Sequence, residues 1–338
     1  MPPAQAGGRD TADVEILTLS GEDVGRHRPE ELDTLLTGDA LVWVDVPSWD
    51  DAAAAVLTDR FGIHPRAAAD CAGRNPVPKV HVYPEHVFVV LHAPELGARG
   101  HVHYVELDQF VGPNWLITVH GPVNPAVPPE AATQETGAVA RRLETGRLHP
   151  RTAPDLCFAL VTALTGRLRD LLSALTEDVW RLERQVTGGH GGDPEQFLEE
   201  LFGVRHGLLT VRTMSALSRE VFDRMSTLDV WPGNGRALLA DIEDQFRRVG
   251  AMAEGQREYL QGVIEFYQAR TNTKMMIAAE RLAVIAAVTL PITALSSIVG
   301  MNVIVNARTH VGQLVALLAV MAAMSAAVLV WARRKGWF

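Results

Sequence analysis

The chain has 338 residues, a hydrophobic share of 47% and a formal net charge of −9. An acidic surface argues against a nucleic-acid partner and suits a protein that meets cations. The two cysteines, Cys71 and Cys157, lack the paired spacing of a zinc motif, so we expect reduced, structural thiols in a cytosolic environment.

The N-terminal part of the chain mixes strand and helix signals. Residues 1–13 are rich in Pro, Gly and Ala and predict a disordered N-terminus. Over residues 14–150, helix-like stretches such as WDDAAAAVLTDRFG alternate with short β-like runs, namely VEILTL, LVWVDV, HVFVVLHA, HVHYVELDQFV and WLITVH. This alternation predicts an α/β domain.

From residue 151 the pattern becomes helical. Residues 151–235 read as two amphipathic helices separated by TGGHGGD, with Asp193 as the expected N-cap of the second helix. Residues 236–281 predict a stalk helix, because their apolar positions alternate in steps of three and four. If this helix continues to residue 299, it is roughly 95 Å long at about 1.5 Å per residue.

Two uncharged runs follow the stalk. Residues 282–301 and 311–332 each contain no Asp, Glu, Lys or Arg and are long enough for a transmembrane helix. They leave an outer loop at 302–310 and a basic tail at 333–338. Because basic residues flank the pair of spans, we expect a multi-pass protein of the plasma (inner) membrane with both termini cytoplasmic. No cleaved signal peptide is expected at the N-terminus.

Two helices per chain cannot enclose an aqueous path, since polar pore groups would then face lipid. Several copies around an axis could do so, and the periodic stalk provides a means of assembly. The first span is the natural pore lining, with Thr293 and Ser297 among its few polar residues and Asn302 at its outer end. A ring of Asn302 amide oxygens suits Mg²⁺, which is recognised with its water shell on.

The tripeptide Gly300, Met301, Asn302 follows LPITALSSIV, and the chain ends in RRKGWF. Together with FGIHPRAAADCAGRNPVPKV in the N-terminal domain, these segments resemble the CorA family of divalent-cation channels. The resemblance implies an α+β protein with an α/β/α cytosolic domain, a helical hairpin and a long stalk helix that runs into the first of two C-terminal transmembrane helices. It also implies a funnel-shaped homopentamer in the lipid bilayer that conducts Mg²⁺, and Co²⁺ or Ni²⁺ as further cargo, and is not an enzyme.

Further roles are implied by the same resemblance. The selectivity filter would be the Gly-Met-Asn tripeptide, and a hydrophobic constriction would use Leu282 and Leu290. Regulatory Mg²⁺ would bind between subunits at Asp70 and Asp241, with Asp244 as a weaker candidate. The chain departs from the family pattern at three pore positions and in the outer loop, namely at Met276 near the inner mouth, Ala283, Val299 and Arg308.

Three alternatives remain open from the sequence. A ZntB-like zinc transporter, with or without proton coupling, shares the architecture, and the histidines His81, His86, His92, His101 and His103 are candidate ligands. A non-conducting membrane sensor would account for the substituted pore positions. A membrane-anchored enzyme is disfavoured, because the sequence contains no phosphate loop, nucleophile elbow, HExxH or strand-linked GxGxxG motif.

Overall fold

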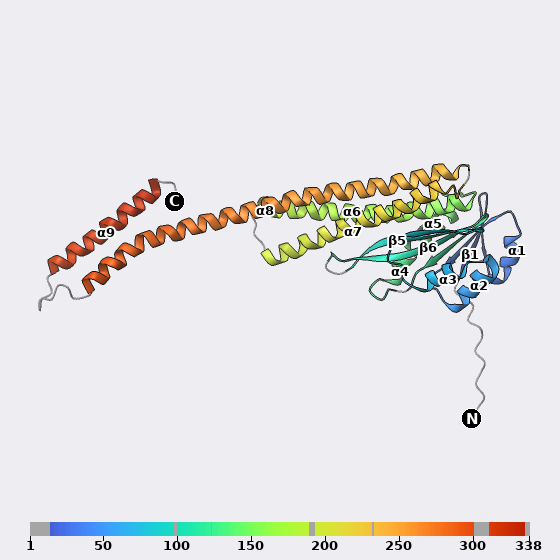
Figure 1. Ribbon diagram of the computed structural model, residues 1–338, viewed down its shortest axis with the longest axis horizontal. Helices are drawn as coiled ribbons and strands as arrows, with labels where there is room; N and C mark the ends of the chain where they lie inside the picture. The colour runs from blue at the N-terminus through green and yellow to red at the C-terminus, as the bar shows by residue number, and fades with distance from the viewer. Residues whose placement is uncertain are drawn as a thin grey trace, which may run out of the picture. The chain divides into compact units, whose positions relative to one another are not determined.

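A computed structural model describes residues 14–97, 100–122, 124–188, 193–231, 233–300 and 311–334 (Figure 1). The chain divides into two compact units, residues 1–261 and residues 262–338. The first unit contains a mixed α+β domain together with long helices, and the second consists of helix alone in its described part.

The first unit is built on a mixed β-sheet. In the described residues the sheet has seven strands in the order β2-β1-β3-β7-β6-β5-β4. Strands β3 and β7 pair in parallel, and every other neighbouring pair is antiparallel. The strands are β1 Glu15–Ser20, β2 Asp23–His27, β3 Leu41–Val46, β4 Lys79–Val82, β5 Val87–Leu96, β6 Val102–Val111 and β7 Trp115–His120.

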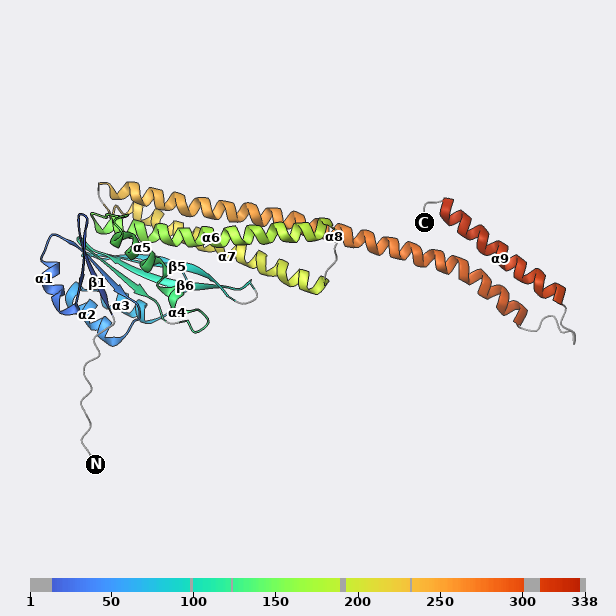
Figure 2. The ribbon, with the colours of Figure 1, turned by 180° about the vertical axis from the view of Figure 1, so that it is seen from behind.

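Helices cover both faces of this sheet, which gives the three-layered α/β/α arrangement seen in Figures 1 and 2. The short helices α2 and α3 pack on one face, and α5 and α6 lie on the other. The bounds of the shorter helices are η1 Pro29–Glu31, α1 Leu32–Leu36, α2 Asp51–Phe61, α3 Pro65–Ala72, α4 Pro129–Ala132 and α5 Gln134–Glu144.

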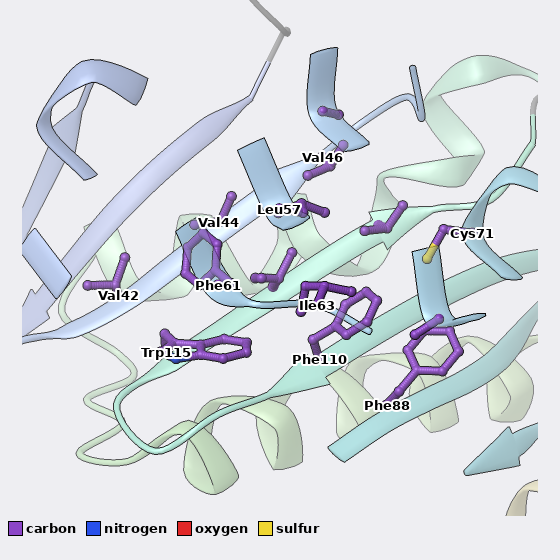
Figure 3. Packing of buried hydrophobic residues seen from close by; sticks show 14 of the residues in the cluster. Val42, Val44, Val46, Leu57, Phe61, Ile63, Cys71, Phe88, Phe110 and Trp115 are labelled. Carbon is purple, nitrogen blue, oxygen red and sulfur yellow. The ribbon is translucent and has the colours of Figure 1, made fainter. Parts of the chain in front are cut away.

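The core under α2 and α3 is shown in Figure 3, where Phe61 and Trp115 meet edge to face at a ring separation of 5.0 Å. Phe88 and Phe110 stack beside them at 4.6 Å. The sequence LVWVDV of β3 is almost wholly buried because the strand is central and both of its faces are covered. At about 25 cal/mol per Å² of apolar area, burial of apolar side chains holds the two helices on the sheet, with Leu57 and Phe61 from α2 and Ala67 and Cys71 from α3.

Three long helices complete the first unit. Helices α6 (Ala153–Gly188) and α7 (Pro194–Thr227) form the expected hairpin. The Asp193 carboxylate accepts a hydrogen bond from the Glu195 backbone N at 3.0 Å, which confirms Asp193 as an N-cap. Helix α8 (Gly235–Gly300) packs on this hairpin through its first turns, where Phe246 stacks on Phe222 of α7 at 5.9 Å.

The second unit contains the rest of α8 and helix α9 (Val311–Arg334). Among the described residues, α8 up to Ser297 contains a segment long and apolar enough to cross a membrane. Pro291 lies inside this helix, as transmembrane helices tolerate. Each of the two helices has one stripe of partly or fully buried residues in this unit. On α8 the stripe consists of Val284, Val288, Pro291, Ile292 and Leu295. On α9 it consists of Met321, Met324, Ser325, Val328 and Ala332.

Candidate ion pathway and regulatory site

The expected selectivity tripeptide lies at the C-terminal end of α8. Gly300 is the last residue of the helix. Met301, Asn302 and the outer-loop residue Arg308 lie outside the described residues, as does the side chain of Val299. The geometry of the filter therefore stays a prediction, and the helix that leads to it is the part that the structure describes.

The candidate pore-lining residues share one face of α8. At about 100° per residue, they fall within an arc of roughly 120°. All of them are exposed in the single chain, and Leu282 and Leu290 are 66% and 67% exposed. The face consists of Met276, Leu282, Leu290, Thr293 and Ser297.

The buried stripe of α8 points the other way. Its five members centre roughly 170° from the centre of the candidate pore-lining arc, by the same helical geometry. Val284, 2% exposed, is the most buried of them, and the matching stripe of α9 includes Ala332 at 1%. Within this unit the two helices thus bury one side of α8 and leave the candidate lining face uncovered.

Two threonine hydroxyls on this part of α8 donate to the helix backbone. Thr289 Oγ1 donates to the Ile285 carbonyl at 2.9 Å, and Thr293 Oγ1 donates to the Thr289 carbonyl at 2.9 Å. The hydroxyl proton is thereby occupied, and the oxygen lone pairs remain as acceptors. Such oxygens suit the water shell of a cation.

Asp70 is positioned by α3, a short helix that begins with His64 as N-cap and Pro65 in its first turn. Ala67 and Cys71 face the core, and Asp70 is left half-buried at the surface. Its carboxylate oxygen Oδ2 lies 2.8 Å from Nζ of Lys79 at the start of β4. The expected regulatory carboxylate is therefore already paired with an ammonium group in the single chain.

Asp241 and Asp244 lie in the first turns of α8. Asp241 Oδ2 accepts a hydrogen bond from Gln245 Nε2 at 3.3 Å, whereas Asp244 forms ion pairs with Arg247 and Arg248. In the described part of one chain, no hydrogen bond or ion pair joins Asp70 to either of these residues. Because two arginines hold it, Asp244 is the poorer cation ligand of the two.

The histidines noted in the sequence do not gather at one site. His92 is buried, and its Nε2 lies 2.7 Å from the Asn75 carbonyl. His86 is enclosed in an aromatic cluster, and His81 lies parallel to Phe88 at 6.5 Å. In the residues that the structure describes, no group of three or more His, Cys, Asp or Glu side chains is arranged to hold a metal ion.

The structure adds two residues that sequence reasoning missed. His206 of α7 stacks on His101 at 5.7 Å, and His101 is itself 4.7 Å from His103. The second residue is Lys79, which lies in the segment FGIHPRAAADCAGRNPVPKV. Only its positive charge could have indicated that it pairs with a carboxylate. The pairing of Lys79 with Asp70 depends on tertiary packing of α3 against β4, which spacing along the chain does not reveal.

Both cysteines are free and buried. Burial raises the pKa of the Cys71 and Cys157 thiols above the usual range, so both stay protonated at neutral pH. Cys157 Sγ donates to Gln109 Oε1 at 2.9 Å. These thiols are part of the core and do not contribute a metal ligand in their thiol form.

The mixed sheet, the long helices and the apolar end of α8 form a fold that is known from solved structures. The complete CorA magnesium transporter from Methanocaldococcus jannaschii matches over 96% of this chain and 98% of its own, with a TM-score of 0.79 and 18% identity. The ZntB cytoplasmic domain from Vibrio parahaemolyticus matches less closely, with a TM-score of 0.59 and 9% identity over 77% of this chain and 98% of its own.

A model of the family described as CorA-like Mg²⁺ transporter protein matches residues 38–334, and the chain therefore belongs to this family. It is a divalent-cation transporter of the membrane and not an enzyme. YfjQ of Bacillus subtilis (strain 168), named as a metal ion transporter, is 25% identical over 88% of this chain and 90% of its own. The cobalt/magnesium transport protein CorA of Thermotoga maritima is 22% identical over 97% of this chain and 93% of its own.

Proposed function

We propose that the chain assembles into a homopentameric channel through which Mg²⁺ enters passively, driven by membrane potential and concentration. Residues 282–301 would form the first transmembrane helix and residues 311–332 the second, with both termini in the cytoplasm. The name of the Thermotoga maritima relative supports Mg²⁺ and Co²⁺ as cargo. Asn302 would form the outer selectivity ring with Gly300 and Met301.

One observation carries this proposal: the candidate lining face of α8 is exposed while the opposite face is buried. Toward lipid, the oxygen acceptors of Thr293 and Ser297 would have no donor, whereas on a water-filled path they can accept hydrogen bonds from water. Neighbouring copies placed around an axis would turn this face toward a shared aqueous path. Leu282 and Leu290 would then form apolar rings that block hydrated ions by dewetting in the closed state.

The stalk part of α8 supports assembly of copies. Met252, Tyr259 and Phe266 are spaced by seven residues and are 59%, 46% and 54% exposed. Large apolar side chains at heptad spacing are typical of helices that pack along one another. A second helix that covers this stripe would remove each of these side chains from water, at about 25 cal/mol per Å² of apolar area.

Gating would rest on carboxylates from adjacent subunits. Intracellular Mg²⁺ would bridge Asp70 of one subunit and Asp241 of the next, with Asp244 close to the same path, and would hold the ring closed. The half-buried position of Asp70 supports this role, because it leaves the carboxylate accessible from one side. Loss of the ion would leave like charges facing one another and would loosen the ring.

Ion flux into liposomes tests the proposal. Purified protein should admit Mg²⁺ down its gradient at a rate that rises with an inside-negative potential, and Co²⁺ and Ni²⁺ should compete. Zn²⁺ uptake that depends on a proton gradient would favour the ZntB-like alternative, and absence of divalent flux would favour a non-conducting sensor. Replacing both Asp70 and Asp241 by Ala should leave the channel open at high internal Mg²⁺, and unchanged inhibition would remove them from the gating mechanism.

A further inference from the structure

A cavity of about 600 Å³ lies beside Asp70, and none of the candidate pore-lining residues borders it. It is bounded by the start of α3, by strand β4 with the residues just after it, and by the C-terminal end of α7. Residues 64–70 and 80–83 thus meet residues 224–228, which lie far along the chain, around one hollow. All of them belong to the first unit.

The charges around this cavity are unbalanced. Arg66 comes from α3 and Arg224 from α7, both are exposed, and neither has an ion-pair partner among the described residues. Asp70 is the carboxylate that lines the cavity, and Lys79 neutralises it at 2.8 Å. Two guanidinium groups therefore remain uncompensated at a concave site, where they attract anions.

The neighbouring polar groups add hydrogen-bond donors. His64 Nδ1 accepts a hydrogen bond from the Arg66 backbone N at 3.1 Å, so the ring proton of the neutral imidazole resides on Nε2. His81, on β4, brings a second imidazole to the lining. Each arginine can offer a planar pair of N–H groups, which matches the oxygens of a phosphate.

The Tyr83 ring at this cavity already stacks on other rings of the protein. Tyr83 has one ring neighbour in His64 at 4.8 Å and another in His86 at 4.9 Å, and both pairs are stacked. Its hydroxyl group is then the part left for a ligand. Recognition at this site accordingly depends on charge and on hydrogen bonds rather than on an aromatic base.

We propose that this cavity binds the phosphate groups of a polyphosphate or nucleotide, with Arg66 and Arg224 as the principal contacts and His64 as an additional donor. The volume of about 600 Å³ exceeds the needs of a single phosphate and suits a di- or triphosphate. The neutralised state of Asp70 matters, because a free carboxylate in the same cavity would repel such an anion. This site shares Asp70 with the proposed regulatory Mg²⁺ site, but anion binding does not require that the chain conducts Mg²⁺.

Binding to the full-length protein in detergent tests the proposal by titration calorimetry, with pyrophosphate and ATP as separate probes in Mg²⁺-free, low-salt buffer. We expect both probes to bind, with an affinity that falls as salt rises. Arg66→Ala combined with Arg224→Ala should weaken binding at least tenfold. Arg219→Ala, which removes an exposed arginine on another face of α7, should leave binding unchanged.

The oligomeric mass of each variant, measured by light scattering, provides the second readout. Equal affinity in the wild type and the double variant would overturn the proposal, and so would absence of binding by either probe. Loss of oligomer in the double variant, with no anion binding by the wild type, would mean that the arginines pair with acidic groups of a second copy. Tight binding of ATP alone, without pyrophosphate, would contradict recognition through phosphate.

Discussion

Nζ of Lys79 lies 2.8 Å from Oδ2 of Asp70, and the two side chains are 27% and 31% exposed. The pair joins the first residue of β4 to the outer side of α3. An internal cation thus occupies the carboxylate that is proposed to receive regulatory Mg²⁺. Any divalent ion at Asp70 must displace the ammonium group or share the carboxylate with it.

Replacing Lys79 by Gln should therefore strengthen Mg²⁺ binding at Asp70. The ion pair is partly exposed, so its removal should have a moderate effect. We expect a three- to tenfold decrease in the Mg²⁺ concentration that gives half-maximal protection from proteolysis, equivalent to about 1 kcal/mol. Protection from limited proteolysis over a Mg²⁺ titration measures this. Arg26→Gln, which removes exposed pairs with Glu15 and Glu144, is the control. An unchanged midpoint for Lys79→Gln would show that Asp70 is not a Mg²⁺ ligand.

Polar substitutions at the proposed constriction should open it. Leu282→Thr and Leu290→Thr would hydrate the apolar rings and should raise the basal leak of divalent ions several-fold, because dewetting blocks ions only while the lining stays apolar. Flux into liposomes at high internal Mg²⁺ is the measurement. Ile285→Thr, exposed on α8 but outside the lining arc, should behave like wild type. Equal flux in all four proteins would argue against a gate at these leucines.

Arg167 holds three elements of the first unit together. Its side chain extends from α6 and is 7% exposed. The guanidinium group donates to Glu135 of α5 at 3.0 Å and to Glu95 of β5 at 2.6 Å. It also donates to the Ala131 carbonyl of α4 at 2.8 Å. Arg167→Ala would leave the buried Glu135 carboxylate unpaired and should cost about 3 to 5 kcal/mol of stability. A matched Arg26→Ala should change the free energy of unfolding by well under 1 kcal/mol. Comparable denaturation midpoints for the two variants would refute this ranking.

His86 should make the first unit sensitive to acid. Burial, with a smaller effect from His64, lowers the pKa of His86 to about 4. The unfolded chain takes up this proton near the ordinary pKa of about 6.5, so stability is full above that pH and falls as the pH drops toward 4, by about 2 to 3 kcal/mol. His86→Phe should flatten this acid dependence of Tm.

His149→Gln is the control for that measurement, because it removes an imidazole outside the aromatic cluster around Tyr83 and Phe110. Its Tm should follow the wild-type pH dependence between pH 4.5 and 7.5. If His86→Phe loses stability in acid as steeply as the wild type, titration of His86 is not the cause.

The strong local patterns of the sequence were sufficient to predict the central strands of the sheet. LVWVDV and WLITVH form β3 and β7 at the expected residues, since long apolar runs admit few alternatives. The edge strands β2 and β4 were missed because DVGRH and KVHV have weak apolar patterns. Their place in the sheet is decided by pairing with neighbours.

The candidate site was predicted unevenly for a similar reason. The apolar run of α8 and the position of Gly300 follow from local sequence, and so does the arc that contains Leu282 and Leu290. The pairing of Asp70 with Lys79 depends on how α3 packs against β4, and the cavity between Arg66 and Arg224 depends on a contact between segments that are distant along the chain. Such contacts leave no spacing signal in a single sequence.

The most direct test of the central claim is Mg²⁺ flux through Asn302→Ala in liposomes, compared with wild type and with Asn306→Ala as a control in the same outer segment. We expect wild type and Asn306→Ala to conduct and Asn302→Ala to lose at least 90% of the flux, on the order of the tenfold change that one lost polar contact produces. Full Mg²⁺ flux through Asn302→Ala would contradict the assignment of Gly300, Met301 and Asn302 as the selectivity filter.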